Sequence, residues 1–227
     1  MEKARKGLAA CLALFLGLTA ACFAFSERAL EVLVRLLGRN LVSFSPEEGF
    51  IALASLSVYC AFVLTLPVAG ILLWRAVVLP RVPGWRKWSI PVFAAATALF
   101  FSGVLLGYHV ILPAGIGFLV GFETEGVRAY ISARKFISFC GGMLIALGLS
   151  FETPLLSFFL ARLGWLKADF FLKRWRQAII ICTVLAAIIT PTPDIYNMML
   201  MMGPLLGLYF VSFLVVLAAK PTAKPGR

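Results

Sequence analysis

One carboxylate, Glu152, lies inside a long apolar stretch, and Pro154 follows two residues later. A carboxylate near the centre of a membrane helix costs roughly 2.5–3.5 kcal/mol, so such a residue usually faces protein, water or a partner. Proline removes a backbone donor and clashes with the carbonyl four residues earlier, here that of Ser150, which predicts a kink. Glu152 is either a structural group, hydrogen-bonded to Ser150 or to a freed backbone group, or a polar spot on an intramembrane groove where another helix docks.

A catalytic or metal site is not expected. Gly148-Leu149-Ser150 faintly resembles the nucleophile motif of intramembrane serine proteases, and His109 is the single histidine. The histidine precedes the serine, which reverses the order in that family, and Ser150 lies beside a carboxylate that suggests another use. A lone histidine is more often structural than a ligand, and the five cysteines lie in apolar segments at no zinc-like spacing. We therefore predict a protein that is not an enzyme and holds no cofactor or metal.

The segment Thr190-Pro191-Thr192-Pro193-Asp194 joins two apolar stretches. Two prolines stiffen this short connection, and Asp194 is suited to cap the helix that follows. We expect an external hairpin shaped by Pro191, Pro193 and Asp194, although turn chemistry alone also accounts for these residues.

The elements that would position these residues are membrane helices. Hydrophobic residues make up 62% of the 227 positions, which indicates a multispanning membrane protein. Six apolar segments predict an all-α bundle of six bent transmembrane helices in one membrane domain, residues 1–227. The segments are 7–25, 51–73, 90–112, 136–161, 177–190 and 198–219. The first is expected to be a retained helix and not a signal peptide, because no clear cleavage site follows it. The fifth is shorter than the roughly 20 residues that cross a bilayer core.

Residues 26–50 form the longest predicted external loop. Apolar residues between charged ones at 24–40 suit an amphipathic helix on the outer surface. Ser45-Pro46-Glu47-Glu48 then predicts a helix start, with a serine that is able to cap, a proline at the first helical position and Glu48 at the capping-box position.

Charge predicts the orientation. With the N-terminus in the cytoplasm, 15 of the 21 basic residues lie on that side, and the other six lie outside among seven acids. Both termini are therefore expected to be cytoplasmic. The basic residues expected on the cytoplasmic side account for the net charge of +11. Tryptophans beside basic residues in the cytoplasmic loops suit anchoring to membrane lipid, and we expect no nucleic-acid partner.

Four motifs together resemble the TatC family, the C subunit of the twin-arginine protein translocase. They are SFSPEEGF, GYHVILPAGIGFL, FISFCGGMLIALGLSFETPLLSFFLARLG and TPTPD, in this order over nearly the whole chain. The most specific piece is Gly148, Phe151, Glu152, Pro154 and Gly164, followed by the Pro-rich turn and Asp194.

The resemblance implies a non-enzymatic receptor with six helices in the cytoplasmic (inner) membrane. Such a protein binds twin-arginine signal peptides and forms an oligomeric complex with single-span TatA- and TatB-type subunits. The complex moves folded precursors across the membrane with the proton-motive force. Phe151, Glu152 and Pro154 would form the intramembrane groove site.

The chain departs from the family pattern at the expected signal-peptide site. Only Glu2 and Arg5, with Lys6, stand in for the family's N-terminal motif, and Trp85 replaces the glutamate before a basic pair. Because paired carboxylates suit two guanidinium groups, a scaffold that has lost signal-peptide recognition is an alternative function. A proton-coupled solute transporter titrating Glu152 is a further alternative, but it needs a relay, and the spans offer only His109.

Overall fold

The computed structural model describes residues 2–37, 41–73, 89–121, 131–190 and 195–219. Within these ranges the chain is helical, apart from one isolated β-bridge between Val42 and Ser132. The elements are α1 (Glu2–Ala24), α2 (Ser26–Leu37), α3 (Pro46–Leu73), α4 (Ser89–Leu106), the π-helical turn η3 (Gly107–Ile111), α5 (Leu112–Val120), α6 (Ala133–Phe151), α7 (Thr153–Arg162), α8 (Ala168–Ile189) and α9 (Ile195–Ala218). The all-α prediction is confirmed for these residues.

Four helical stretches in the described ranges are long and apolar enough to cross a membrane: Glu47–Leu72, Ser89–Phe118, Ala133–Arg162 and Ile195–Ala218. A bent pair, Ala9–Ala24 with Ser26–Arg35, adds a fifth if it counts as one span, and its two halves differ in direction by 67°. The predicted fifth segment falls in α8, whose first turns carry Asp169 and several basic residues. The count of six spans therefore stays a prediction.

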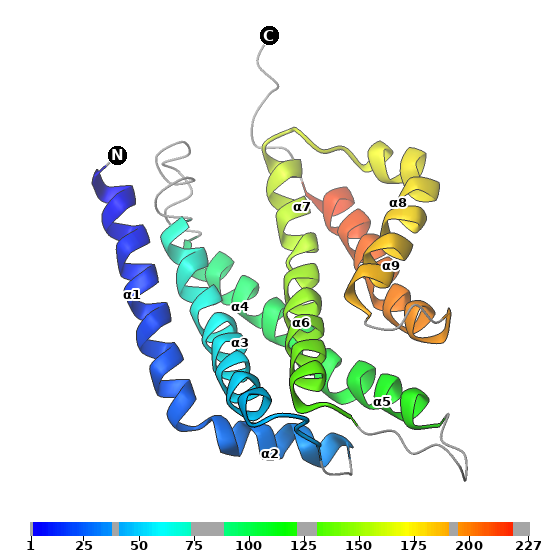
Figure 1. Cartoon of the computed structure of the whole chain (residues 1–227). Coiled ribbons are helices and arrows are strands. Elements are labelled where there is room, and N and C mark those ends of the chain that lie inside the picture. The colour runs from blue at the N-terminus through cyan, green and yellow to red at the C-terminus, as the bar shows by residue number, and fades with distance from the viewer. Residues whose placement is uncertain (1, 38–40, 74–88, 122–130, 191–194, 220–227) are drawn as a thin grey trace. The chain divides into compact units, whose positions relative to one another are not determined.

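The chain divides into two compact units. The first contains Met1–Ala98 and Leu112–Ile145, and the second contains Leu99–Ile111 and Ala146–Arg227. In the first unit α1 lies alongside α3, and α2 turns away from α1 and contacts both α3 and α5 (Figure 1). On α2 Leu33 and Leu37 are buried while Glu27 and Glu31 are exposed, so this helix packs one apolar face on the unit.

The helix α3 starts at Pro46, where the sequence predicts a helix start. The Glu48 carboxylate accepts the backbone N–H of Phe44 at 2.8 Å and the hydroxyl of Ser132, and the bond to Phe44 replaces the capping-box bond to Ser45. Beside this contact the Val42 N–H donates to the Ile131 carbonyl at 3.0 Å. The sequence pattern held no sign of the bond to Ser132, which ties the start of α3 to the start of α6.

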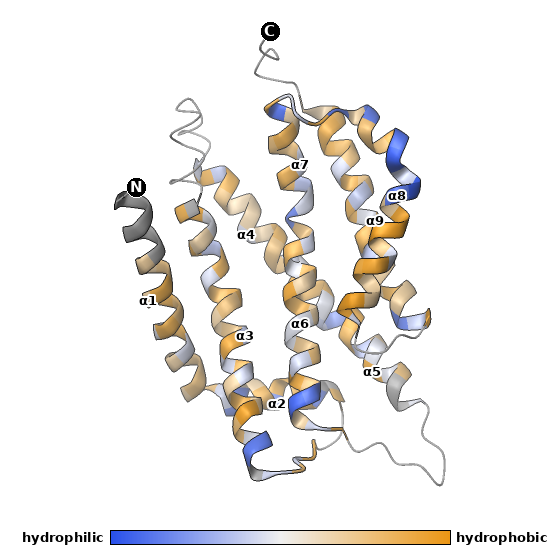
Figure 2. Cartoon of the chain, turned by 45° about the horizontal axis from the view of Figure 1, so that its top comes forward, coloured by the Kyte–Doolittle hydropathy of each residue, from blue (hydrophilic) through white to orange (hydrophobic). Residues whose placement is uncertain are grey.

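Three helices, α7, α8 and α9, build most of the second unit, and α9 contacts both of the others (Figure 1). Ala161, Phe171 and Val216 form a buried cluster, and the Tyr209 hydroxyl donates to the Phe171 carbonyl at 2.8 Å. Figure 2 shows a hydrophilic stretch in the first turns of α8, whereas α9 is mainly hydrophobic. The charged start of α8 is thus attached to the unit by Phe171.

The connection from α7 to α8 needs a glycine. Gly164 has a φ of 78°, in the left-handed region that glycine adopts without steric cost. The Trp165 N–H then donates to the Leu160 carbonyl at 2.9 Å, which closes the last turn of α7. This explains why glycine occupies position 164 in the motif that surrounds Glu152.

Candidate intramembrane site at the α6–α7 break

The helix is interrupted between α6 and α7, where the sequence predicts a disturbance. Glu152 is the one residue between them and keeps right-handed helical angles, φ −74° and ψ −14°. Pro154 has no N–H to give to the Ser150 carbonyl, and the Thr153 hydroxyl donates to that carbonyl at 2.6 Å instead. Two backbone hydrogen bonds continue across the break. The Glu152 N–H donates to the Leu149 carbonyl at 3.1 Å, and the Leu156 N–H donates to the Glu152 carbonyl at 3.0 Å. The break is therefore mild and hydrogen-bonded.

The Glu152 side chain is half-buried and makes no capping hydrogen bond to α7. It has no hydrogen-bond or ion-pair partner among the residues that the structure describes. The Ser150 hydroxyl donates to the Ala146 carbonyl at 2.7 Å, so the bond between Ser150 and Glu152 that one alternative required is not formed. The carboxylate is thus able to accept hydrogen bonds from another molecule.

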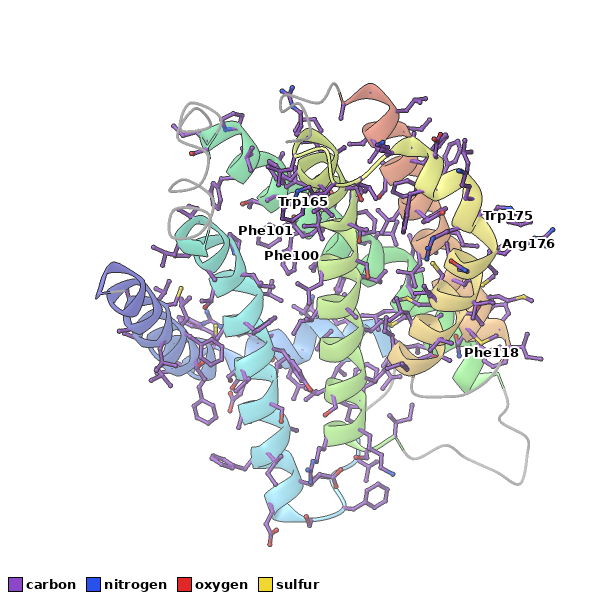
Figure 3. The ribbon with its side chains drawn as sticks, turned by 90° about the horizontal axis from the view of Figure 1, so that it is seen from above. Phe100, Phe101, Phe118, Trp165, Trp175 and Arg176 are labelled. Carbon is purple, nitrogen blue, oxygen red and sulfur yellow. The ribbon has the colours of Figure 1, made fainter. Side chains whose placement is uncertain are left out.

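Close packing within the second unit holds the segment that leads to Glu152. A Cβ on Gly103 of α4 would lie 2.8 Å from the Leu147 carbonyl and 2.9 Å from the Phe151 ring. A Cβ on Gly148 of α6 would likewise lie 2.5 Å from the Phe100 ring. Figure 3 shows the Phe100 and Phe101 side chains beside α6. Two glycines therefore allow aromatic rings to approach the backbone just before the break.

The structure describes the other predicted site residues only in part. Pro191, Pro193 and Asp194 lie outside the described residues, as does Trp85. Glu2 and Arg5 lie in α1, but their side chains are not described. The structure thus describes the side chains of only one group of predicted site residues, Phe151, Glu152 and Pro154.

His109 lies in the π-helical turn η3. Its ring packs edge-on against Tyr108, with the ring centroids 4.9 Å apart, and the residue is exposed. In the described part of the chain no three His, Cys, Asp or Glu residues gather in a way that could hold a metal ion.

Sequence reasoning missed a pocket of about 280 Å³ in the second unit, lined by residues of α8 and α9 and by Ser150 and Thr153. Glu152 does not line it. The residues that carry its polar end, Arg174 and Gln177, are spaced three apart at the point where α8 changes from charged to apolar. This boundary is the one sequence signal for the pocket.

Comparison with known proteins gives a consistent match. The family model for the Sec-independent protein translocase protein TatC matches residues 1–204. The protein of that name from Helicobacter pylori (strain J99) is 30% identical over 225 residues, which cover 99% of this chain and 90% of the relative. The chloroplast TATC protein of rice is 34% identical over 194 residues, which cover 83% of this chain and 53% of the relative. The chain thus spans about half of the chloroplast relative and nine-tenths of the bacterial one.

Solved structures match as well. A crystal structure of the twin arginine translocase receptor TatC superposes with a TM-score of 0.85 at 27% identity, covering 96% of this chain and 98% of that one. A second crystal structure of this receptor, in the detergent DDM, gives a TM-score of 0.82 with the same coverage.

Proposed function

Because the chain belongs to the TatC family of Sec-independent protein translocase proteins, we propose that it is the core receptor and scaffold subunit of a twin-arginine-type translocase. The family is a translocase family and not an enzyme family, and the apolar helices make this chain a multi-pass membrane protein. In the proposed role it moves folded proteins across the cytoplasmic membrane, driven by the proton-motive force.

The proposed topology has six spans with both termini in the cytoplasm. Four helical stretches are apolar enough to span alone, and α1 and α8 supply the other two. The apolar part of α8, from Gln177 onward, is shorter than a typical span, so the bilayer would thin beside it or neighbouring helices would cover it. The excess of basic residues in the cytoplasmic segments supports this orientation.

The observation that carries the proposal is the Glu152 carboxylate in an apolar stretch long enough to span a membrane, which has no hydrogen-bond or ion-pair partner among the described residues. A half-buried carboxylate without a partner is costly in an apolar environment, so a donor from a docking helix stabilises it. In the proposed role that helix belongs to a single-span TatA- or TatB-type subunit or to the precursor. Phe151 and Pro154 set the direction of the segment that presents the carboxylate.

The proposal assigns signal-peptide contact to Glu2 and Arg5, and the outer hairpin to Pro191, Pro193 and Asp194. The loop from 75 to 89 contains no acid, and Trp85 occupies the position of the family's glutamate. This observation favours a second candidate function, a scaffold that binds partner helices but leaves signal recognition to another subunit.

Binding of a synthetic signal peptide separates the two candidates. We expect the detergent-solubilised protein to bind a peptide with the Arg-Arg pair more tightly than one with Lys-Lys at low salt. The reason is that a carboxylate accepts two parallel bonds from a guanidinium group but not from an ammonium group. Glu2→Ala should remove this preference. Equal binding of both peptides would exclude the receptor role and leave the scaffold.

A further inference from the structure

The pocket in the second unit has two chemically different ends. Its apolar wall includes Ile181 and Leu185 of α8 and Leu205 and Leu208 of α9. Its polar end carries Arg174 and Gln177, near the start of α8. From Phe170 to Leu185 the lining follows α8 for roughly 22 Å, at 1.5 Å per residue. The pocket is therefore an elongated apolar slot with a cation at one end.

The Arg174 side chain is held at this end. The backbone of α8 departs from helical geometry at Arg174, with φ −115° and ψ 17°, which marks a kink. Its guanidinium lies over the Phe170 ring, 5.2 Å from the centroid, and donates to the Gln177 side-chain oxygen at 3.4 Å. A guanidinium has five N–H donors, so most of them stay available to an anion. No acid is among the described residues that line this pocket.

We propose that this slot binds an anionic phospholipid, with one acyl chain between α8 and α9 and the phosphate at Arg174 and Gln177. A soluble anion would leave the apolar wall in water, and an uncharged chain would leave the guanidinium without a counter-ion. Two further cations, Lys173 and Arg176, raise the local positive charge and favour an anionic headgroup.

The lipid also suits the length of α8. Its apolar part starts at Gln177 and ends at Ile189, so it is short for a span, and a chain in the slot would cover the Ile181 and Leu185 side of this segment. Glu152 does not line the slot, although Ser150 and Thr153 on either side of it do, and lipid binding does not depend on the proposed transport role.

The headgroup is tested with two arginines of the same helix. Arg176 lies two residues from Arg174, but Figure 3 shows it pointing outward from α8, and its guanidinium lies over Trp175 at 5.4 Å. The delipidated full-length protein is titrated with phosphatidylglycerol, and bound lipid is counted by native mass spectrometry. We expect Arg174→Gln to weaken binding about tenfold, the effect of losing one charged hydrogen bond, while Arg176→Gln changes it little. Equal losses in both variants would overturn the site.

The acyl chain is tested with two alanines. Ala178 lines the slot, whereas Ala187 is exposed and does not. Ala178→Phe should abolish phosphatidylglycerol binding with both arginines intact, and Ala187→Phe should not. Retained binding in Ala178→Phe contradicts the proposal, as does equally tight binding of zwitterionic phosphatidylcholine by the unmodified protein. If Ala178→Phe lowers the melting temperature strongly, the comparison of Arg174→Gln with Arg176→Gln alone tests the proposal. Both arginines are exposed, so replacing them should not unfold the protein.

Discussion

At the scale of single residues, the account depends on Glu152. Its carboxylate is half-buried in a stretch long and apolar enough to span a membrane, without a partner in the described part of the chain. Leaving a buried polar group unpaired costs about 1–3 kcal/mol, and more when the group is charged. A docking helix that supplies a donor removes this cost.

We predict that Glu152→Ala abolishes transport while folding and membrane insertion persist, because the side chain makes no hydrogen bond or ion pair with the described residues. Glu152→Gln should keep part of the activity, since an amide still exchanges hydrogen bonds with a partner. The measurement is export of a reporter, with insertion checked by membrane fractionation. Normal transport by the alanine variant would disprove the groove role. Loss in both variants together with pH-dependent solute flux in proteoliposomes would favour the proton-coupled transporter.

A second prediction concerns the Ser150 carbonyl. It accepts a hydrogen bond from the Thr153 hydroxyl, because Pro154 lacks the N–H that would otherwise donate to it. Thr153→Val should lower the unfolding free energy by about 1 kcal/mol. In a Pro154→Ala background the same change should cost almost nothing, because the substituted residue then has a backbone N–H that serves the carbonyl. Unfolding in detergent of the unmodified protein, the two single variants and the double variant gives the coupling energy between Thr153 and Pro154.

Thr19→Val is the control for this cycle. The Thr19 hydroxyl donates to the Phe15 carbonyl at 2.8 Å inside α1, where the carbonyl also accepts a backbone N–H of the helix. Additive effects of Thr153→Val and Pro154→Ala would show that the hydroxyl does not replace the missing backbone bond.

Glu152 was predictable from the sequence because an acid is rare inside an apolar segment, and the break beside it was predictable because Pro154 lacks a backbone N–H. The helix start at Pro46 was also predictable, because it depends on neighbouring residues, although the Glu48 carboxylate accepts from Phe44 and not from Ser45. The bond between Glu48 and Ser132 was not predictable, because it joins residues 84 positions apart. The pocket around Arg174 is lined from several helices and left only a weak signal in the sequence.

At the scale of elements, helix packing relies on where small residues lie. Gly141 and Gly142 are neighbours on α6 within the first unit, but they differ in surroundings. A Cβ on Gly141 would overlap the Tyr59 ring of α3, whereas a Cβ on Gly142 meets nothing within 4 Å. The two positions therefore form a matched pair.

We predict that Gly141→Ala lowers the unfolding free energy by about 1–3 kcal/mol, because the ring must shift. Gly142→Ala should raise it by about 0.5–1 kcal/mol, because alanine favours the helix without a clash. Thermal unfolding in detergent measures both. Equal effects of the two substitutions would mean that α6 and α3 do not pack as described.

Long apolar segments predicted the position of most helices, because length and hydropathy together determine a span. The helix α8 is longer than the predicted segment 177–190, and it begins at Ala168. The prediction used hydropathy alone, and hydropathy does not detect the charged first turns, which are helical although they are too polar to lie in the bilayer core.

At the scale of the whole molecule, the predicted orientation depends on charge alone. We predict that fluorescent proteins fused to either terminus fluoresce in the cytoplasm, because 15 of the 21 basic residues then lie on that side. A cysteine introduced at Glu27, which is exposed on α2, should react with an impermeant maleimide from outside in a variant that lacks the native cysteines. Labelling only after lysis would mean that residue 27 lies on the cytoplasmic side and that the predicted orientation is wrong.

The number of spans could not be settled from hydropathy, because α1 and α8 fall near the limit of length or charge. Signal-peptide recognition was equally hard to predict, since it depends on the placement of Glu2 relative to a loop that carries no acid. Signal-peptide recognition is the feature that decides whether the chain is a receptor or a scaffold.

Export of a folded reporter tests the central claim most directly. The chain is produced with its single-span partner subunits in a bacterium that lacks its own TatC, and a fluorescent protein with a twin-arginine signal peptide is followed to the outer side of the membrane. The account predicts export that stops when a protonophore collapses the proton-motive force and when Glu152 is replaced by alanine. A chain that inserts stably beside its partners and exports nothing, or exports regardless of the protonophore, would contradict it.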